Sequence, residues 1–326
     1  MMFEGFVDRV NSEKPLFTPG PASLLVENLS GLGPCFGRGD SNYDDTEERV
    51  LGFLRTITGQ ETIARFQGSG SLALEMLAMN FLRGHVIIVE TGYYSARLKV
   101  LAESAARRLG QVKSVTILPW AEIEDANVRA DWVWACPVET SIGLKIDIRS
   151  LSDLSSRCGA RLALDAIASI GLEPFHELAD VVAFSSCKGL FGLTGAAFLG
   201  FSNSPEVEVD SFYLSVGSHL EKKMTGPYHS IQSLDAVLER HDELRGAVVR
   251  NKAVFVERFH DYLVHREENQ PLLCTHVSRR LNSLSGKSVL YEARGEIVGS
   301  VVSHLGEVYL GKSATGKILS DLAVSD

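Results

Sequence analysis

The sequence has few cysteines, and none of them pair at a zinc-binding spacing. Its five cysteines, Cys35, Cys136, Cys158, Cys187 and Cys274, are odd in number and scattered, with no CxxC motif. Disulfide-stapled domains and zinc sites both need cysteines in matched sets. We therefore expect reduced thiols in a cytoplasmic protein and no metal site.

Long apolar runs and basic blocks are also missing. Without a run of about eighteen apolar residues, no membrane span is expected. Residues 1–14 mix acids and bases around no apolar centre, which argues against a signal peptide. The formal net charge is −9, so neither a nucleic acid nor an anionic membrane is an expected partner.

What the chain does contain is a regular alternation of apolar runs and helical patterns. Its 326 residues, 45% hydrophobic and 22% charged, are typical of a globular protein with about two domains. Strands buried on both faces and alternating with helices predict an α/β fold with a mostly parallel sheet. The predicted strands are 85–90, 114–118, 131–136, 161–165, 181–185 and 196–201, and the predicted helices are 45–57, 72–82, 96–109 and 148–157.

The two ends of the chain have different patterns. The first 45 residues are rich in glycine, proline, aspartate and asparagine, which predicts an extended arm with turns. A long amphipathic pattern with Val248, Phe255, Phe259 and Tyr262 on one stripe predicts a connecting helix over 234–263. Beyond it we expect a smaller α+β domain with short strands at 272–277, 288–293 and 296–304 and a terminal helix at 313–322. The expected division is an arm over 1–15, a large domain over 16–245 and a small domain over 246–326.

Two segments suit an anion and a cation. Gln67-Gly-Ser-Gly-Ser71 opens a helix, so it forms either a phosphate-binding turn or a serine-capped helix start; alone, the two are equally favoured. Asp165 ends an apolar strand, where an ionised acid needs a cationic partner. Capping of the next turn is the plainer interpretation of Asp165 taken alone.

Two further segments supply an amine and an aromatic ring. Lys188 follows an apolar strand and precedes a small apolar loop, so desolvation would lower its pKa and suit it to covalent catalysis, although a lysine reaching solvent fits as well. Tyr94 follows another strand and could stack on a planar ligand or fill a turn. Together, a phosphate site, a stacking ring, an acid and a lysine are what pyridoxal 5′-phosphate requires.

The same segments, read in order, resemble the class V aminotransferases of pyridoxal phosphate fold type I, and among them the 2-aminoethylphosphonate–pyruvate transaminases. The matching motifs span most of the chain: Leu16-Phe-Thr-Pro-Gly-Pro21, Gln67-Gly-Ser-Gly-Ser71, Gly92-Tyr-Tyr94-Ser-Ala-Arg97, Val138-Glu-Thr-Ser-Ile-Gly143, Asp165-Ala-Ile-Ala-Ser-Ile-Gly171, Ser185-Ser-Cys-Lys188 and Thr225-Gly-Pro-Tyr-His-Ser230. The resemblance implies a mostly parallel seven-stranded sheet between helices, a smaller α+β C-terminal domain and a homodimer with the cofactor site at its interface. It also implies a transaminase that moves an amino group from a small amino donor to a carbonyl acceptor.

The resemblance further implies a role for each motif residue. Lys188 would form the Schiff base and, once freed, move a proton, while Asp165 would pair with the pyridine nitrogen. The phosphate would be held by Ser69, Gly70 and Ser71, the ring would stack on Tyr94, and Thr140 or Ser141 would reach the ring hydroxyl. His229 and Ser230 would reach the partner subunit's cofactor.

One position departs from the family. The segment Ser300-Val-Val-Ser-His-Leu-Gly-Glu-Val-Tyr309 has Val301 where the family has the arginine that grips the substrate's acidic group. A valine cannot form that ion pair. Arg294 lies a few residues upstream and is the candidate replacement. The small domain is also shorter between 270 and 288.

Three other interpretations are weaker. Gly306–Ser313 has the spacing of a P-loop, but only thirteen residues follow it, too few for the strands such a domain needs. A lyase or desulfurase of the same fold is another pyridoxal phosphate activity, yet Cys187 stands where desulfurases carry a histidine and Cys274 has core-like neighbours. Loss of the substrate arginine is also compatible with a non-catalytic cofactor-binding homologue. We expect His304, near the altered segment, to be structural, and Glu139 to order its loop rather than to act as an acid.

Overall fold

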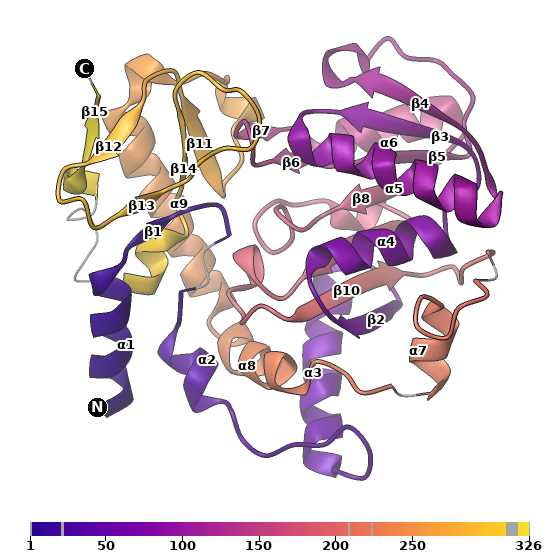
Figure 1. Cartoon of the computed structure of the whole chain (residues 1–326), viewed down its shortest axis with the longest axis horizontal. Coiled ribbons are helices and arrows are strands. Elements are labelled where there is room, and N and C mark those ends of the chain that lie inside the picture. Colours follow the sequence, from indigo (N-terminus) through magenta and orange to yellow (C-terminus); the bar gives the residue numbers. More distant parts are fainter. Residues whose placement is uncertain (1, 21–22, 208, 223, 311–318, 326) are drawn as a thin grey trace.

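A seven-stranded sheet forms the centre of the computed structural model (Figure 1), which describes residues 2–20, 23–207, 209–222, 224–310 and 319–325. Five strands are paired in parallel, and β10 runs antiparallel to both of its neighbours. The prediction of an α/β fold with a mostly parallel seven-stranded sheet is confirmed. In spatial order the strands are β2 (Thr62–Gln67), β10 (Ala196–Phe201), β9 (Val181–Ser185), β8 (Arg161–Asp165), β5 (Trp132–Ala135), β3 (Gly84–Glu90) and β4 (Val112–Pro119).

The strand β2 had no counterpart among the strands predicted from local pattern. Its sequence, Thr-Ile-Ala-Arg-Phe-Gln, carries an arginine inside the apolar run. The charge is tolerated because Arg65 forms an ion pair with Glu47 of the neighbouring helix α3 (Ser41–Thr58). Local hydrophobicity alone therefore misses this edge strand.

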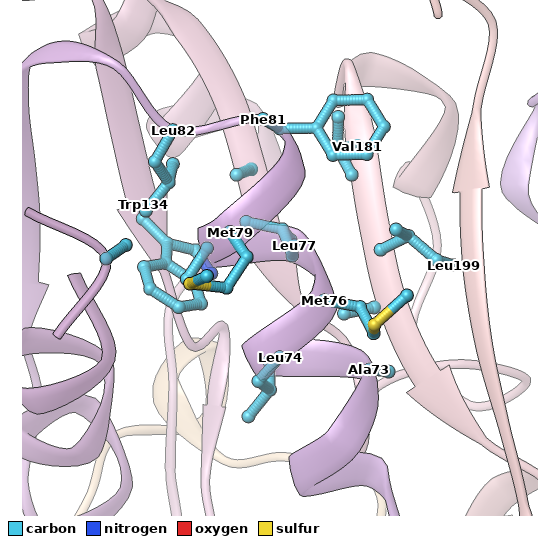
Figure 2. Packing of buried hydrophobic residues seen from close by; sticks show 14 of the residues in the cluster. Ala73, Leu74, Met76, Leu77, Met79, Phe81, Leu82, Trp134, Val181 and Leu199 are labelled. Carbon is cyan, nitrogen blue, oxygen red and sulfur yellow. The ribbon is translucent and has the colours of Figure 1, made fainter. Parts of the chain in front are cut away.

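Helices cover both faces of the sheet, because alternate residues of each strand point to opposite sides. One hydrophobic cluster joins Phe66, Ile88 and Trp134 to α4 and α5, and the other joins Ile87, Val133 and helices on the opposite face. Figure 2 shows Leu74, Leu77 and Met79 of α4 gathered with Trp134 in the first cluster. The covering helices are α3 (Ser41–Thr58), α4 (Gly70–Asn80), α5 (Tyr93–Leu109), α6 (Ile148–Cys158) and α8 (Tyr228–Leu238).

The C-terminal part is a separate cluster of short strands beside the sheet (Figure 1). Its core holds Phe255, Val277, Val302 and Leu322. The pairs are β11 (Cys274–Val277) with β14 (Ser300–Ser303), β12 (Leu281–Ser283) with β15 (Leu322–Val324), and β1 (Leu16–Phe17) with β13 (Val289–Leu290). A small hairpin, β6 (Val138–Glu139) and β7 (Leu144–Lys145), follows β5, and α7 (Val216–Lys222) follows β10.

The N-terminal segment differs from the expected extended arm. Residues 2–13 form helix α1 (Met2–Glu13), followed by the short helix α2 (Val26–Ser30). Val7 and Asn11 are buried on one face, and Asn11 Nδ2 donates to the carbonyl oxygens of Leu24 and Tyr309. This helix is stabilised by long-range contacts that a local reading of glycine and charge cannot include. The domain boundaries at 15 and 245 stay predictions.

The amphipathic stretch over 234–263 is two helices, so the prediction of one long helix is wrong. Helix α8 ends at Leu238, and α9 (His241–Arg258) begins three residues later. Val248 and Phe255 are buried as the stripe predicted, but Tyr262 lies in a separate 3₁₀ turn (His260–Tyr262). The spacing of apolar residues continues across the break with nearly the same phase, so the sequence pattern gave no sign that there are two helices.

The predicted terminal helix over 313–322 lies mostly outside the described residues. The part that is described differs from it, since Leu319–Asp321 is a 3₁₀ turn and Leu322–Val324 is β15. Leu322 is fully buried and its strand pairs with β12, so strand pairing rather than helical propensity decides this end. Within the described ranges, the structure has no helix with the length and apolarity that crossing a membrane requires.

A buried carboxylate in the turn η6 (Gly306–Leu310) gives a pH-dependent prediction. Glu307 is 8% exposed, Oε1 has no hydrogen-bond partner among the described residues, and burial raises its pKa from 4.5 to about 7. The unfolded chain ionises at the lower pKa, so stability falls as pH rises from about 4.5 through about 7. We expect Glu307→Gln to raise the free energy of unfolding by about 1–3 kcal/mol at pH 8 and to change it little at pH 4.5.

Denaturant titration of wild type and Glu307→Gln at both pH values measures this effect. The exposed Glu257 on α9 supplies the control, because Glu257→Gln should change neither value by more than about 0.5 kcal/mol. An equal stabilisation by Glu307→Gln at pH 4.5 and pH 8 would contradict the assignment.

Candidate active site

Most of the predicted site residues meet at one edge of the sheet, where the carboxyl ends of β3, β5, β8 and β9 lie. A cavity of about 140 Å³ opens there. Six of the residues singled out from sequence line it: Gly70, Ser71, Tyr94, Thr140, Asp165 and Lys188. The same wall also includes Arg97, Cys136, Val138, Ile167, Ala168, Ser185 and Cys187.

The start of α4 forms one wall of the cavity. Ser69 is the N-cap residue, and its side chain makes no capping hydrogen bond. A Cβ on Gly70 would lie 2.5 Å from Ile167 Cδ1, so only glycine lets the helix start approach this wall. The first N–H groups of a helix have no partners within it and attract anions. This end of the cavity can therefore bind an anionic group.

Asp165, the last residue of β8, is 2% exposed. Its Oδ1 accepts from the backbone N–H of Ile167, and its Oδ2 lies 3.1 Å from Arg97 Nη2. Burial raises the pKa of this carboxyl, while the positive charges of Arg97 and Lys188 act in the opposite direction. The acid can pair with a cationic group of a ligand at the base of the cavity.

Lys188 lies after β9 in the turn η3 (Lys188–Leu190), half-buried in the cavity wall. Its φ is 58°, and Phe191 has the same left-handed value. Non-glycine residues adopt this region at a cost and are frequent at functional sites. Lys188 Nζ is 5.9 Å from the centre of the Tyr94 ring. The strained turn directs the amine into the space beside the aromatic ring.

Tyr94 is held in place by a buried carboxylate under the start of α5. Glu139, fully buried, accepts hydrogen bonds from the backbone N–H groups of Tyr94 and Ser95 at Oε2 and from Ser141 at Oε1. A Cβ at position 92 would lie only 3.0 Å from Glu139 Cγ. Because Gly92 has no side chain, its loop can approach Glu139 this closely. The expectation that Glu139 orders its loop fits these contacts.

Thr140 and Ser141, left as alternatives by the sequence, differ in position. Both are buried, but only Thr140 lines the cavity. Ser141 gives both its N–H and its hydroxyl to Glu139. Of the two, only Thr140 is placed to contact a ligand in the cavity.

His229, Ser230 and Arg294 lie outside the cavity. His229 is exposed and Ser230 Oγ donates to Thr194 O, both in the first turn of α8. Arg294 Nη1 donates to Tyr93 Oη at 3.2 Å, and its guanidinium lies over the Tyr93 ring. Arg294 is exposed and contacts the residue next to Tyr94, so it lies at the outer rim of the site.

The altered family position is part of the hydrophobic core. Val301 is 1% exposed in β14, in a cluster with Cys274, Leu305 and Phe191. His304 is buried, accepts or donates one hydrogen bond with Thr275 Oγ1, and burial lowers its pKa to about 3, in accord with a structural role. Position 301 therefore offers no charged group to a substrate.

The alternative interpretations find little support. Burial raises the pKa of Cys274 to about 12, whereas a nucleophilic cysteine needs a lowered pKa and access to solvent. The first five residues of the P-loop pattern form the buried turn η6, and the rest lie outside the described residues. Among the described residues no group of three histidine, cysteine, aspartate or glutamate side chains could hold a metal ion.

Arg97 is the last residue of the motif Gly92–Arg97, but it was given no role of its own from the sequence. It lies three residues after Tyr94 on α5 and thus on the same helix face, with its guanidinium 5.3 Å from the Tyr94 ring centre. Besides Asp165, it contacts Ser71 Oγ through Nη1 at 3.1 Å. The i, i+3 spacing from Tyr94 was the signal available in the sequence.

Comparisons with known proteins agree with this geometry. The chain is 26% identical over 262 residues to 2-aminoethylphosphonate–pyruvate transaminase of Pseudomonas aeruginosa, covering 73% of this chain and 70% of that protein. Its fold superposes on alanine–glyoxylate aminotransferase from Nostoc sp. with a TM-score of 0.79, at 18% identity over 95% and 94% of the two chains. Pyridoxamine–pyruvate aminotransferase from Mesorhizobium loti gives 0.74, at 19% identity over 94% and 93%.

The family model named aminotransferase class-V matches residues 37–239, which include the sheet and every residue found here to line the cavity. This match covers well over half of the chain. The resemblance read from the motifs is therefore confirmed, and the chain belongs to the class V aminotransferase family.

Proposed function

We propose that this protein is a pyridoxal 5′-phosphate-dependent transaminase of the 2-aminoethylphosphonate–pyruvate transaminase type. The observation that carries the proposal is the convergence of Lys188, Asp165 and the open start of α4 on one cavity. Each group has the character that one part of the cofactor requires. The names and identities of the curated relatives support the same type of reaction.

The residues present fit this cofactor. The phosphate would be held by Ser69, Gly70 and Ser71 at the helix start, and the ring would lie against Tyr94, within reach of Thr140. Arg97 Nε is buried in the cavity wall and has no acceptor among the described residues, which suits a site built around an anionic ligand. When bound, the cofactor supplies an aldehyde for the amine and an electron-withdrawing ring.

In this proposal the protein's own groups perform three tasks. Lys188 Nζ would hold the cofactor covalently and, when free, would move a proton from the substrate α-carbon to the C4′ carbon of the cofactor. Asp165 keeps a ring-nitrogen proton in place through its negative charge. The apolar wall, with Val138 and Ile167, excludes water from the reacting atoms.

The substrates are a small amino donor and a carbonyl acceptor. Val301 lies in the core, so we propose that the acidic end of the substrate is bound by another residue, with Arg294 at the rim as the candidate. His229 is exposed and Ser230 is half-buried at the start of α8, a position from which they could reach the cofactor of a second subunit in a homodimer.

The direct test is the visible absorption spectrum of the purified protein with added cofactor, followed by borohydride reduction and peptide mass spectrometry. We expect an absorption band that reduction removes and a cofactor-sized mass on the peptide containing Lys188. Bleaching of the band by 2-aminoethylphosphonate, and its recovery with pyruvate, would identify the reaction. No band and no adduct would refute the proposed cofactor.

Removing the charge of Asp165 should impair chemistry more than binding. Asp165→Asn cannot hold the ring-nitrogen proton, so we expect kcat to fall about 10²–10³-fold with a smaller change in cofactor affinity. Steady-state kinetics with saturating cofactor measures this. The control is the exposed Asp153 on α6, since Asp153→Asn should behave as wild type. A variant Asp165→Asn with wild-type kcat would contradict the role.

A further inference from the structure

We propose that Arg97 is a positioning residue that couples the ring-nitrogen and phosphate ends of the cofactor site. The inference rests on the proposed cofactor, and it adds a residue and a linkage that the motif comparison alone does not assign. One guanidinium joins Ser71, on the anion-binding helix start, to Asp165, at the end of β8.

The two terminal nitrogens of Arg97 contact opposite ends of the site. Arg97 Nη1 is 3.1 Å from Ser71 Oγ, and Nη2 is 3.1 Å from Asp165 Oδ2. The two terminal nitrogens of a guanidinium are fixed in one plane, so a shift of either partner is transmitted to the other. The Arg97 side chain is 28% exposed and that of Asp165 only 3%, so the pair is largely shielded from water.

The contact determines which way the Ser71 hydroxyl can donate. A guanidinium group can only donate hydrogen bonds, so Ser71 Oγ must be the acceptor of the N–H of Arg97 Nη1. The hydroxyl proton is then left free to donate elsewhere. The adjacent start of α4 is where an anion is favoured, so Arg97 prepares Ser71 to donate to a phosphate there.

The contact through Arg97 Nη2 opposes neutralisation of Asp165 and fixes its orientation. Burial alone favours the neutral acid. With Oδ1 held by Ile167 N and Oδ2 by Arg97 Nη2, the carboxyl group is fixed in one orientation, and the positive charge of Arg97 opposes its neutralisation. Lys188 also opposes neutralisation, but Arg97 is the group in direct contact. A fixed carboxylate is what a protonated ring nitrogen requires.

The substitution Arg97→Lys would keep the positive charge but lose the pair of donor nitrogens fixed in one plane. An ammonium is a point charge that cannot hold both partners in the same rigid plane. Arg97→Lys should therefore preserve the charge effect on Asp165 and lose the coupling to Ser71. Arg97→Met should lose both. The two variants separate electrostatics from positioning.

The experiment measures dissociation constants of pyridoxal 5′-phosphate and of pyridoxal, which lacks the phosphate, by equilibrium dialysis. We expect Arg97→Met to weaken pyridoxal phosphate about 100-fold and pyridoxal about 10-fold, in line with the loss of one or two charge-assisted hydrogen bonds. Arg97→Lys should bind pyridoxal within about 3-fold of wild type and pyridoxal phosphate about 10-fold more weakly.

A double-mutant cycle with Ser71→Ala tests the coupling itself. For pyridoxal phosphate, the double variant Ser71→Ala, Arg97→Met should bind no more than about 3-fold more weakly than Arg97→Met alone, because both changes remove the same linkage. For pyridoxal, Ser71→Ala should have less than about a 2-fold effect.

The matched control is Arg108, on the same helix and also bonded to α4, through Glu75 at 3.0 Å. Arg108→Met should bind both ligands as wild type, and circular dichroism of all variants checks that they are folded. If wild type binds pyridoxal phosphate on Lys188 but Arg97→Met binds both ligands normally, or Ser71 and Arg97 act additively, the inference is wrong and the proposed function stands. If wild type itself binds no cofactor, both fail.

Discussion

Lys188→Ala is expected to lose multiple-turnover transamination by at least about 10³-fold, the largest effect of any single change in this protein. The alanine has no amine to attach the cofactor or to move a proton at the substrate α-carbon. Lys188 Nζ is the only side-chain amine among the described residues that lines the cavity, so no neighbour there replaces it. Coupled assays of product formation measure the loss.

The same variant should keep its fold and retain some cofactor without a covalent bond. Asp165, Tyr94 and the start of α4 are untouched, so absorption after reduction should show bound but unattached cofactor. Lys99→Ala, on the exposed side of α5, removes a lysine without entering the cavity and should retain full activity. Undiminished repeated turnover by Lys188→Ala would remove the basis of the mechanism.

Glu139→Ala is expected to produce the largest loss of stability, about 3–5 kcal/mol. The carboxylate accepts hydrogen bonds from Thr91, Tyr94, Ser95 and Ser141, and it is fully buried at the positive start of α5. Removing it leaves several buried donors without acceptors, each at a cost of about 1–3 kcal/mol before relaxation. Denaturant titration gives the free energy of unfolding.

The same substitution should also impair function. Tyr94 is held by its backbone N–H to Glu139, so cofactor affinity should fall together with stability. Glu103→Gln on the exposed face of α5, where Glu103 lies 3.9 Å from Lys99, should change stability by less than about 0.5 kcal/mol. Equal stability of Glu139→Ala and wild type would show that the buried network contributes nothing.

These two expectations differ in how far the sequence alone anticipated them. Lys188 was identified from its place after an apolar strand and from the motif around it, and the structure puts it in the cavity wall. Glu139 was read only as ordering its loop. Its four partners come from two segments 40 to 50 residues apart in the chain, and no local pattern reveals that they converge.

The elements follow the same division. The strands β3, β5, β8 and β9 matched their apolar runs, because strands buried on both faces must be apolar throughout. Strand β2 and helix α1 were missed because their charged or polar residues, Arg65 and Asn11, find partners that are distant in sequence. The break between α8 and α9 was hidden because periodicity continues across it.

By itself, the sequence determined the fold class, the family and most of the residues that line the cavity and could act there, because burial, strand ends and helix starts leave local signatures. Only the tertiary structure decided which of those residues share a cavity. It left Ser141 bonded to Glu139, put Arg294 at the rim and Val301 in the core, and brought Arg97 onto both Asp165 and Ser71. The reason is physical: a pattern along the chain records which side chains must be buried, whereas contact between two strand ends depends on how the whole sheet is ordered.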